Sequence, residues 1–187
     1  DVLRDTRRSL KYLPHVSLPK QVDVSRDVDP TVEMAVLAVP SHAMRNVVGT
    51  YSFSPQTIRV TVAKGIENET LLRMSEVIRQ VSGDCTVLAL SGPSHAEEVA
   101  VDLPTSVVVA GEDADACAIA QRTFMSSQFR VYTSSDILGV ELGGALKNVI
   151  AIAAGVCDGF GLGDNAKAAI ITRGLAEITR LGVKLGG

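Results

Sequence analysis

The sequence predicts an α/β fold in which a doubly wound, mostly parallel sheet is followed by the start of an all-helical domain. Apolar, β-branched runs of strand length recur through the first two thirds of the chain, and helix-like segments separate them. No strand-like run follows residue 134. Strands that alternate with crossover helices form parallel sheets covered by helices. We therefore expect a partial α/β domain over residues 1–134 and the start of a helical domain over residues 135–187.

Five segments have the composition of strands. Residues 32–39 (VEMAVLAV) are almost continuously apolar, which is typical of a strand buried on both faces. Residues 57–63 (TIRVTVA) are rich in β-branched side chains, which favour strands. The other three strands are expected at residues 86–90, 105–110 and 129–132.

Helices are expected before, between and after these strands. Residues 1–9 have the charged composition of a helix end, and a loop with Pro14 and Pro19 follows. The spacing of apolar residues predicts helices over residues 42–48, 69–81 and 113–125. Two long helices, residues 135–156 and 164–184, then flank the glycine-rich loop 158–163.

Composition narrows the class of protein. The chain has 187 residues, of which 46% are hydrophobic and 21% charged, as in ordinary globular proteins. A net charge of -3 does not favour a nucleic-acid partner. The most apolar stretch, Val149 to Cys157, is far shorter than the ~20 residues of a membrane span. Three scattered cysteines form neither a metal-ligand pair nor a disulfide framework, which indicates a reducing cytosol.

Three consecutive strands are expected to end in turns that carry polar groups. These turns are Val39-Pro40-Ser41-His42, Ala63-Lys64-Gly65 and Ser91-Gly92-Pro93-Ser94. Ligands bind at the carboxyl ends of strands in open parallel sheets. One such turn is ordinary, but three of them, one with a lysine, favour a site. We expect Pro40, Lys64, Gly92 and Ser94 to lie together at one edge of the sheet.

Ser94 and Glu97 have the spacing of a capping box at the start of a helix. Capping alone would explain both residues. A helix N-terminus after Gly92-Pro93 would also suit an anionic ligand, because its free N–H groups point outward. His95 is either a ligand or base, or a partly buried ring in the cap, and the second interpretation is favoured.

Lys147 is the strongest candidate for a catalytic residue. Its neighbours three and four positions away are Gly143, Gly144, Ile150 and Ala151, so no acid on the same helix pairs with it. A lysine held on such a small, apolar face would lose hydration, and its pKa would fall toward the range useful for proton transfer. The alternative is that its side chain extends into solvent. Asn148 would hold a substrate hydroxyl or bond to the backbone.

Several segments together resemble the NAD(P)-dependent glycerol-3-phosphate dehydrogenase family, bacterial branch. The matching segments are YLP from Tyr12, AVPSH from Ala38, KGIE from Lys64, LSGPSHAEEVA from Leu90, and the long segment GVELGGALKNVIAIAAGVCDGFGLGDNAKAAIITRGLAEITRLG from Gly139 to Gly182. The resemblance covers nearly the whole chain, and the last segment is highly specific. It implies a Rossmann-like, NAD(P)-binding sheet domain and a helical domain for substrate and dimer contacts.

The resemblance also implies roles for particular residues. Lys147 matches the catalytic lysine, which accepts the proton when the C2 alcohol of glycerol 3-phosphate is oxidised to dihydroxyacetone phosphate. Lys64 matches a lysine that contacts both cofactor and substrate. The remaining matches are Gly92, Ser94 and Asn148 as substrate contacts and Ala96 as a cofactor contact. The cofactor would be NAD or NADP, and no metal is implied.

The resemblance further implies a cytoplasmic homodimer that supplies glycerol 3-phosphate for phospholipids. No G-x-G-x-x-G opens a helix in this sequence, so we expect a fragment that lacks the N-terminal dinucleotide fingerprint and the C-terminal part of the family. Such a piece alone should not be catalytically competent. Two alternatives stay open: another two-domain hydroxyacid-type dehydrogenase, and a non-catalytic relic without the cofactor loop.

Overall fold

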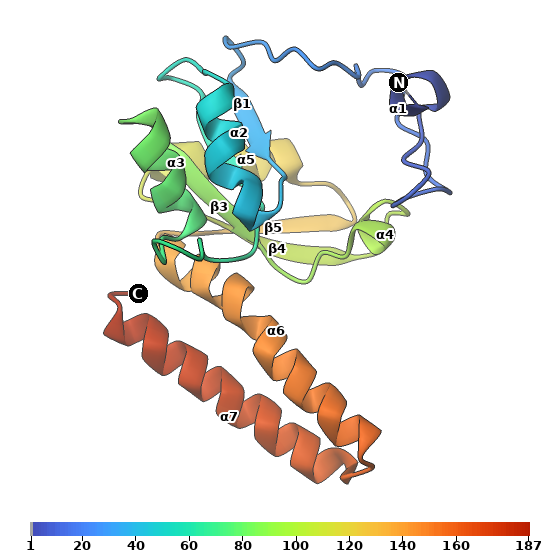
Figure 1. Ribbon diagram of the computed structural model, residues 1–187, viewed down its shortest axis with the longest axis vertical. Coiled ribbons are helices and arrows are strands. Elements are labelled where there is room, and N and C mark those ends of the chain that lie inside the picture. The colour runs from blue at the N-terminus through green and yellow to red at the C-terminus, as the bar shows by residue number, and fades with distance from the viewer. Residues whose placement is uncertain (1) are drawn as a thin grey trace.

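The computed structural model describes residues 2–187 and contains one five-stranded sheet followed by a helical hairpin (Figure 1). The strands lie side by side in chain order, β1 (Met34–Leu37), β2 (Ile58–Thr61), β3 (Val87–Ser91), β4 (Thr105–Ala110) and β5 (Phe129–Ser134). Adjacent pairs are parallel except for β3 and β4, which are antiparallel. The expected mostly parallel sheet is therefore present, with one reversal in its middle.

The helices are α1 (Val2–Thr6), the 3-10 turn η1 (Ser41–Ala43), α2 (Met44–Thr50), α3 (Met74–Ser82), α4 (Ala96–Val99), α5 (Ala114–Phe124), α6 (Ile137–Gly159) and α7 (Gly163–Lys184). The reversal at β4 explains why α4 is so short. An antiparallel neighbour needs no crossover, whereas a parallel one usually needs a helix. The chain between β3 and β4 therefore turns back at the sheet edge.

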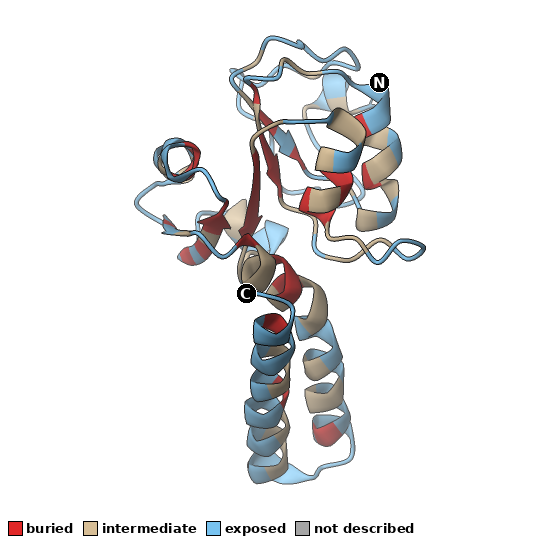
Figure 2. Cartoon of the chain, turned by 90° about the vertical axis from the view of Figure 1, so that its left-hand side faces the viewer, coloured by how far each residue is buried: buried red, intermediate tan, exposed pale blue. Residues whose placement is uncertain are grey.

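Apolar side chains cover both faces of the sheet. Leu37 and Val87 pack with the inner faces of α2 and α3 on one side. On the other side, Leu88 and Val107 pack with α5. Figure 2 shows this buried layer running through the sheet, while the distal helical hairpin is mostly exposed. Strands buried on both faces have apolar residues at successive positions, which is why β3 reads as a continuous apolar run.

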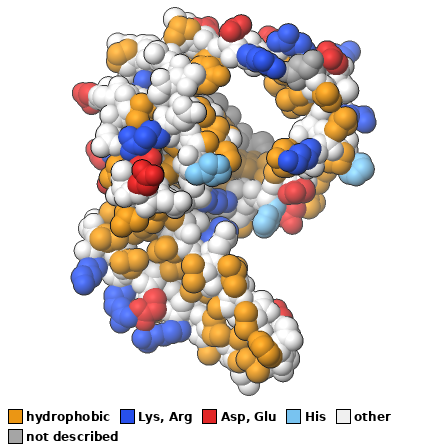
Figure 3. Space-filling model, in the orientation of Figure 1, with side chains coloured by type: hydrophobic (Ala, Val, Ile, Leu, Met, Phe, Trp, Pro, Cys, Tyr) orange, Lys and Arg blue, Asp and Glu red, His pale blue; other side chains and the backbone are white. Residues whose placement is uncertain are grey.

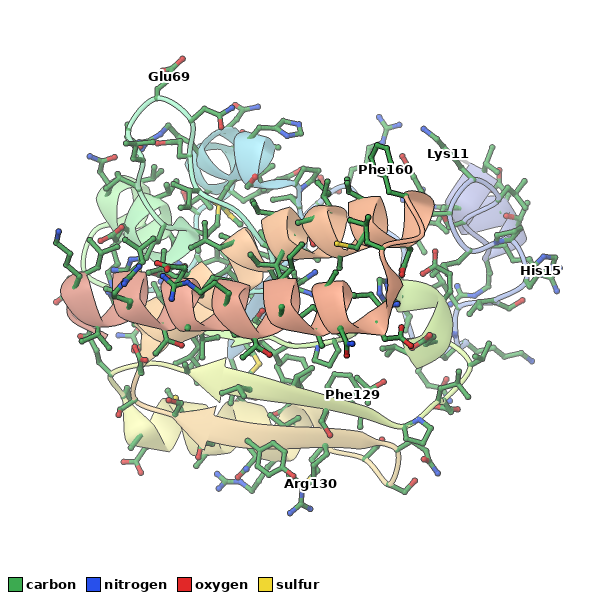
Figure 4. All side chains as sticks on the ribbon, turned by 90° about the horizontal axis from the view of Figure 1, so that it is seen from below. Lys11, His15, Glu69, Phe129, Arg130 and Phe160 are labelled. Atoms are coloured by element: carbon green, nitrogen blue, oxygen red, sulfur yellow. The ribbon has the colours of Figure 1, made fainter. Side chains whose placement is uncertain are left out.

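Two sequence-based expectations about these elements are wrong. The helix expected over residues 69–81 begins only at Met74. Residues 66–73 instead form a loop closed by the Glu67 N–H, which donates to the Leu72 carbonyl at 2.9 Å. Leu71 has φ of 58° and is 75% exposed, so it does not belong to an apolar helix face. Figure 4 shows Glu69 projecting from this loop into solvent.

The first strand also differs from its expectation. β1 is shorter than the apolar run of residues 32–39, and Val36 is 47% exposed. β1 is an edge strand of the sheet and its burial is interrupted at Val36, whereas four successive residues of β3 are buried. Burial on both faces is thus found at β3 and not at β1.

The helical hairpin begins against the sheet and extends away from it. Ile137 packs on Ala89 and Ala110, which fixes the start of α6 on the sheet. α6 and α7 then run antiparallel, and Figure 4 shows Phe160 at their connection. Among residues 2–187, only α6 has the length and composition that a membrane span requires. This is weak evidence, because core helices of soluble proteins meet the same criterion. Val149–Cys157 by itself is too short, but the helix that contains it is not.

Candidate functional site

The carboxyl ends of β1, β2 and β3 lie at one edge of the sheet, and the turns that follow them touch. A Cβ on Gly65 would lie 2.6 Å from the Ser41 hydroxyl oxygen, so the first two turns are in contact. The Lys64 Nζ donates a hydrogen bond to the Gly92 carbonyl oxygen at 2.9 Å, which joins the second and third turns. The Ser94 hydroxyl donates to the same oxygen at 3.3 Å. We call Ser41, Lys64, Gly92 and Ser94 the rim cluster.

Helix α6 contacts the rim cluster directly. A Cβ on Gly144 would lie 2.7 Å from the Ser91 hydroxyl oxygen and 3.5 Å from the Lys64 Cγ. Lys147 lies about one turn further along α6. Burial, and then the nearby Lys147 ammonium, lower the pKa of Lys64. Two lysines, one after β2 and one on α6, therefore meet beside a close helix–rim contact.

A cavity of about 380 Å³ lies between the rim and α6. Its wall includes Ser91, Gly92 and His95 from the rim side and Gly143, Gly144 and Lys147 from the helix. Small-molecule sites commonly measure a few hundred Å³. Figure 3 shows basic side chains in the hollow between the sheet part and the hairpin. The cavity thus has room for a small molecule, with Lys147 in its wall and Lys64 nearby as a second cation that would attract an anionic ligand.

Lys147 is placed at the cavity, but its environment differs from the expectation. The residue is exposed, so the expected loss of hydration by burial is wrong for this chain. Asn148 and Val149, which follow it on α6, are exposed as well. The Lys147 Nζ donates to the Asn148 Oδ1 at 2.7 Å, and among residues 2–187 no carboxylate forms a salt bridge with it. The Lys64 side chain is also exposed, and partial desolvation of its ammonium lowers its pKa.

The other expected site residues lie near the rim without lining the cavity. Pro40 directly precedes Ser41 in the first turn and caps η1. Asn148 is exposed beside Lys147. Ala96 is exposed at the first position of α4, two residues beyond Ser94.

The capping box expected at Ser94 and Glu97 is wrong. His95 is the N-cap of α4, with no side-chain capping hydrogen bond. The Ser94 hydroxyl instead donates to the Gly92 carbonyl oxygen. Ser94 therefore stabilises the turn after β3.

The sequence placed Ser91 in the third turn without a role of its own, and it gave no role to Glu141. Ser91 lines the cavity because β3 extends one residue further than expected. Glu141 is buried and binds Arg73 and Ser75 at the start of α3. A carboxylate inside an otherwise apolar helix was the available signal, because buried acids are almost always paired.

A larger cavity of about 850 Å³ lies elsewhere, near the amino ends of β1 and β2. Glu33 is the titratable residue in its wall, which also includes Met34, Ile58 and Ile119. Ligands of open parallel sheets bind at the carboxyl ends of the strands, which is the opposite edge. The smaller cavity at the rim cluster is therefore the candidate site.

Fold and site together define a class: an α/β domain of the dinucleotide-binding type joined to a helical element, with a lysine-lined crevice between them. The family model described as the NAD-dependent glycerol-3-phosphate dehydrogenase N-terminus matches residues 1–117, and the model for the C-terminus of the same family matches residues 136–187. The chain belongs to the NAD-dependent glycerol-3-phosphate dehydrogenase family.

Individual relatives agree with this assignment. The chain is 48% identical over 188 residues to a glycerol-3-phosphate dehydrogenase (NAD(P)+) of Clostridium perfringens, covering 97% of this chain and 56% of the relative. It is 51% identical over 191 residues to the protein of that name from Thermoanaerobacter, again covering 97% and 56%. The crystal structure of glycerol-3-phosphate dehydrogenase from Coxiella burnetii superposes with a TM-score of 0.91 at 33% identity, covering 99% of this chain and 58% of that one.

The similarity to these proteins bears on the fold class and on how much of the relatives' length this chain spans. The doubly wound, Rossmann-like sheet followed by helices is confirmed by the superposition on the Coxiella burnetii structure. The chain spans little more than half the length of the curated relatives it matches. The expected family is confirmed, and the alternative of another two-domain hydroxyacid-type dehydrogenase is set aside.

Proposed function

We propose that the full-length protein is an NAD(P)-dependent glycerol-3-phosphate dehydrogenase. It would interconvert sn-glycerol 3-phosphate and dihydroxyacetone phosphate by hydride transfer with NAD or NADP. The observation that carries the proposal is the approach of Lys64 and Lys147 beside the Gly92 turn, with Lys147 in the wall of the cavity there. Two cations beside each other are costly without an anion, and a phosphorylated substrate supplies one. The relatives are named glycerol-3-phosphate dehydrogenases, which supports the same substrate.

Each site residue has a proposed role in this reaction. Lys147 accepts the proton of the C2 hydroxyl during oxidation of glycerol 3-phosphate, and returns it in the reverse direction. Lys64 binds substrate and the reacting end of the cofactor, while Gly92, Ser94 and Asn148 contact substrate. Lys64 is anchored to the Gly92 carbonyl, so its ammonium is held in place before substrate arrives.

The residues of this chain fit part of the nicotinamide cofactor. The cavity of about 380 Å³ has room for a three-carbon phosphate and one ring, and not for a whole dinucleotide. Lys64 and Ala96 would hold the reacting end, and the cofactor would supply the hydride acceptor at its nicotinamide C4. The sequence holds no glycine-rich pyrophosphate cradle, so that part of the binding site is expected from residues outside this chain.

The domain bounds, the assembly and the cellular location of the protein are also proposals. We propose that residues 1–134 belong to the cofactor domain and residues 135–187 to the helical domain. Large apolar side chains on the hairpin are exposed, Ile152 by 70% and Val183 by 65%, which supports a cover from a second subunit or from further helical-domain residues. We further propose a cytoplasmic homodimer with no membrane span and no nucleic-acid partner. Its product would feed phospholipid synthesis.

The test uses the full-length protein and the variant Lys147→Met, which keeps most of the side-chain volume and removes the amine. Positioned acid–base catalysis contributes on the order of 10²–10⁴ in rate, so kcat should fall at least about a hundredfold. Cofactor binding, followed by fluorescence, should change little. A wild-type protein that does not turn over glycerol 3-phosphate would show a non-catalytic relic. A variant with near-normal kcat would remove Lys147 from the proton transfer.

A further inference from the structure

Glu141 joins α6 to the N-terminus of α3 by three hydrogen bonds. Its Oε1 accepts from the Ser75 backbone N–H at 2.8 Å. Its Oε2 accepts from the Ser75 hydroxyl at 2.6 Å and from the Arg73 Nη1 at 2.8 Å. The Glu141 side chain is 5% exposed and that of Arg73 16%. We call these three residues the α3–α6 clamp.

The clamp is well made in physical terms. Ser75 is the second residue of α3, and its N–H is one of the four that a helix leaves without an internal partner. A carboxylate at this end of a helix also interacts favourably with the helix dipole. Arg73 adds a charge-assisted hydrogen bond, so both carboxylate oxygens of Glu141 accept hydrogen bonds from the start of α3. A buried carboxylate paired in this way holds one geometry, because losing a partner would leave a buried charge unpaired.

On the α3 side of the clamp, Arg73 is connected to Lys64 through the loop between β2 and α3. Ile66 and Arg73 form a bridge between the two ends of the loop that links β2 to α3. Lys64 lies two residues before Ile66, on the same loop. Arg73 is held further by Glu76, with its Nη2 at 2.8 Å from the Glu76 Oε1. The arginine that binds α6 therefore belongs to the segment that also positions Lys64.

On the α6 side of the clamp, Glu141 is connected to Lys147 along the helix. Glu141, Gly144 and Lys147 follow one another at three-residue spacing, which places them along one side of α6. Gly144, in the middle, contacts Ser91 and Lys64. The neighbouring ammonium groups of Lys64 and Lys147 repel each other, and this repulsion favours movement of α6 away from the rim.

We propose that Glu141, through Arg73 and Ser75, is a positioning residue that holds Lys147 at the cavity and beside Lys64. The role in catalysis rests on the proposed dehydrogenase function. The clamp lies about one turn before the Gly144 contact and Lys147 about one turn after it, so loss of the clamp lets α6 pivot and separates the two lysines.

The first test needs no enzyme activity and uses Glu141→Gln. The rate at which acetic anhydride acylates Lys64 is measured by mass spectrometry as a function of pH, and its midpoint reports the Lys64 pKa. Lys64 owes its lowered pKa to burial and to Lys147, so separation of the lysines raises the midpoint. Removal of the Glu141 charge alone acts in the other direction, because a lost negative charge lowers the pKa of a lysine. A raised midpoint supports the clamp, and an unchanged or lowered midpoint overturns it.

Two further variants keep this test decisive. Ser75→Ala removes one hydrogen bond and leaves the ion pair, so it should fold and shift the midpoint upward by a smaller amount. Glu177→Gln is the matched control, because Glu177 is paired with Arg173 and Arg180 on the exposed side of α7. Its midpoint should equal that of the wild type. A shift of the same size in the control would show a general charge effect and overturn the proposal.

The second test measures kinetics in the full-length protein. A misplacement of about 1 Å can cost on the order of a hundredfold in rate, so Glu141→Gln should lower kcat tenfold to a hundredfold. KM for both substrates should stay within about twofold, since the binding groups remain. Arg73→Met should behave alike, and the double variant should be no worse than the poorer single one. Additive losses would overturn the clamp. An inactive wild type would refute the dehydrogenase proposal and leave the acylation result to decide the geometry.

Discussion

Replacement of Gly92 by alanine tests how tightly the site is built into the sheet. A Cβ at this position would lie 2.7 Å from the Ser106 carbonyl oxygen, 2.9 Å from the Val107 Cα and 3.0 Å from the Val107 Cγ1. The first two are backbone atoms of β4, which pairs with strands on both sides and cannot move alone. Gly92 does not have a positive φ, so this contact accounts for the whole cost.

The expected loss of stability follows from overpacking. Forcing extra atoms against a well-packed core costs about 1–3 kcal/mol. For a chain of this size, each kcal/mol lowers Tm by roughly 2–4 °C, so Gly92→Ala should lower Tm by about 2–12 °C. Circular dichroism melting of the chain is the assay. Gly155→Ala is the control, because Gly155 lies in α6 with open space around it. It should gain roughly 0.5–1 kcal/mol from helix propensity. A Gly92→Ala variant as stable as the wild type would refute the reasoning.

Two further predictions concern Lys64 and Glu67. In the full-length protein, Lys64→Ala should raise KM for the phosphorylated substrate and lower kcat, because the anchored ammonium serves both binding and orientation; unchanged kinetics would make Lys64 a simple turn residue. Hydrogen bonds from Arg45 and then Thr70 lower the pKa of Glu67 from 4.5 to about 2. A depressed carboxylate pKa stabilises the fold above the unfolded value near 4.5, and this contribution disappears as pH falls toward 2. Glu67→Gln should therefore flatten the decline of Tm between pH 4.5 and 2; parallel curves for variant and wild type would contradict the pairing.

Local patterns along the sequence determined the order and type of the main elements. Apolar and β-branched runs identified all five strands, because strand burial requires such residues whatever their neighbours are. Turn residues after the strands placed Lys64, Gly92 and Ser94 at one edge, since parallel strands end on the same side. The long helices after residue 134 were also predictable, because a glycine-rich turn separates two helix-like stretches.

Tertiary structure decided what local patterns could not. The late start of α3 depends on Leu71, whose positive φ and loop contacts are set by the Glu67–Leu72 pairing and by Arg45. The reversal at β4 depends on pairing between segments distant in sequence, which leaves no periodic signal.

Tertiary structure also decided the environments of the two lysines. Sequence assigned the desolvated side chain to Lys147, whereas both lysine side chains are exposed in the fold and partial desolvation lowers the pKa of Lys64. The Glu141 clamp likewise joins residues 66 and 68 positions apart. Sequence specifies which groups a chain carries, but the pKa and partners of each group depend on which distant segments pack against it, and only the folded structure determines that packing.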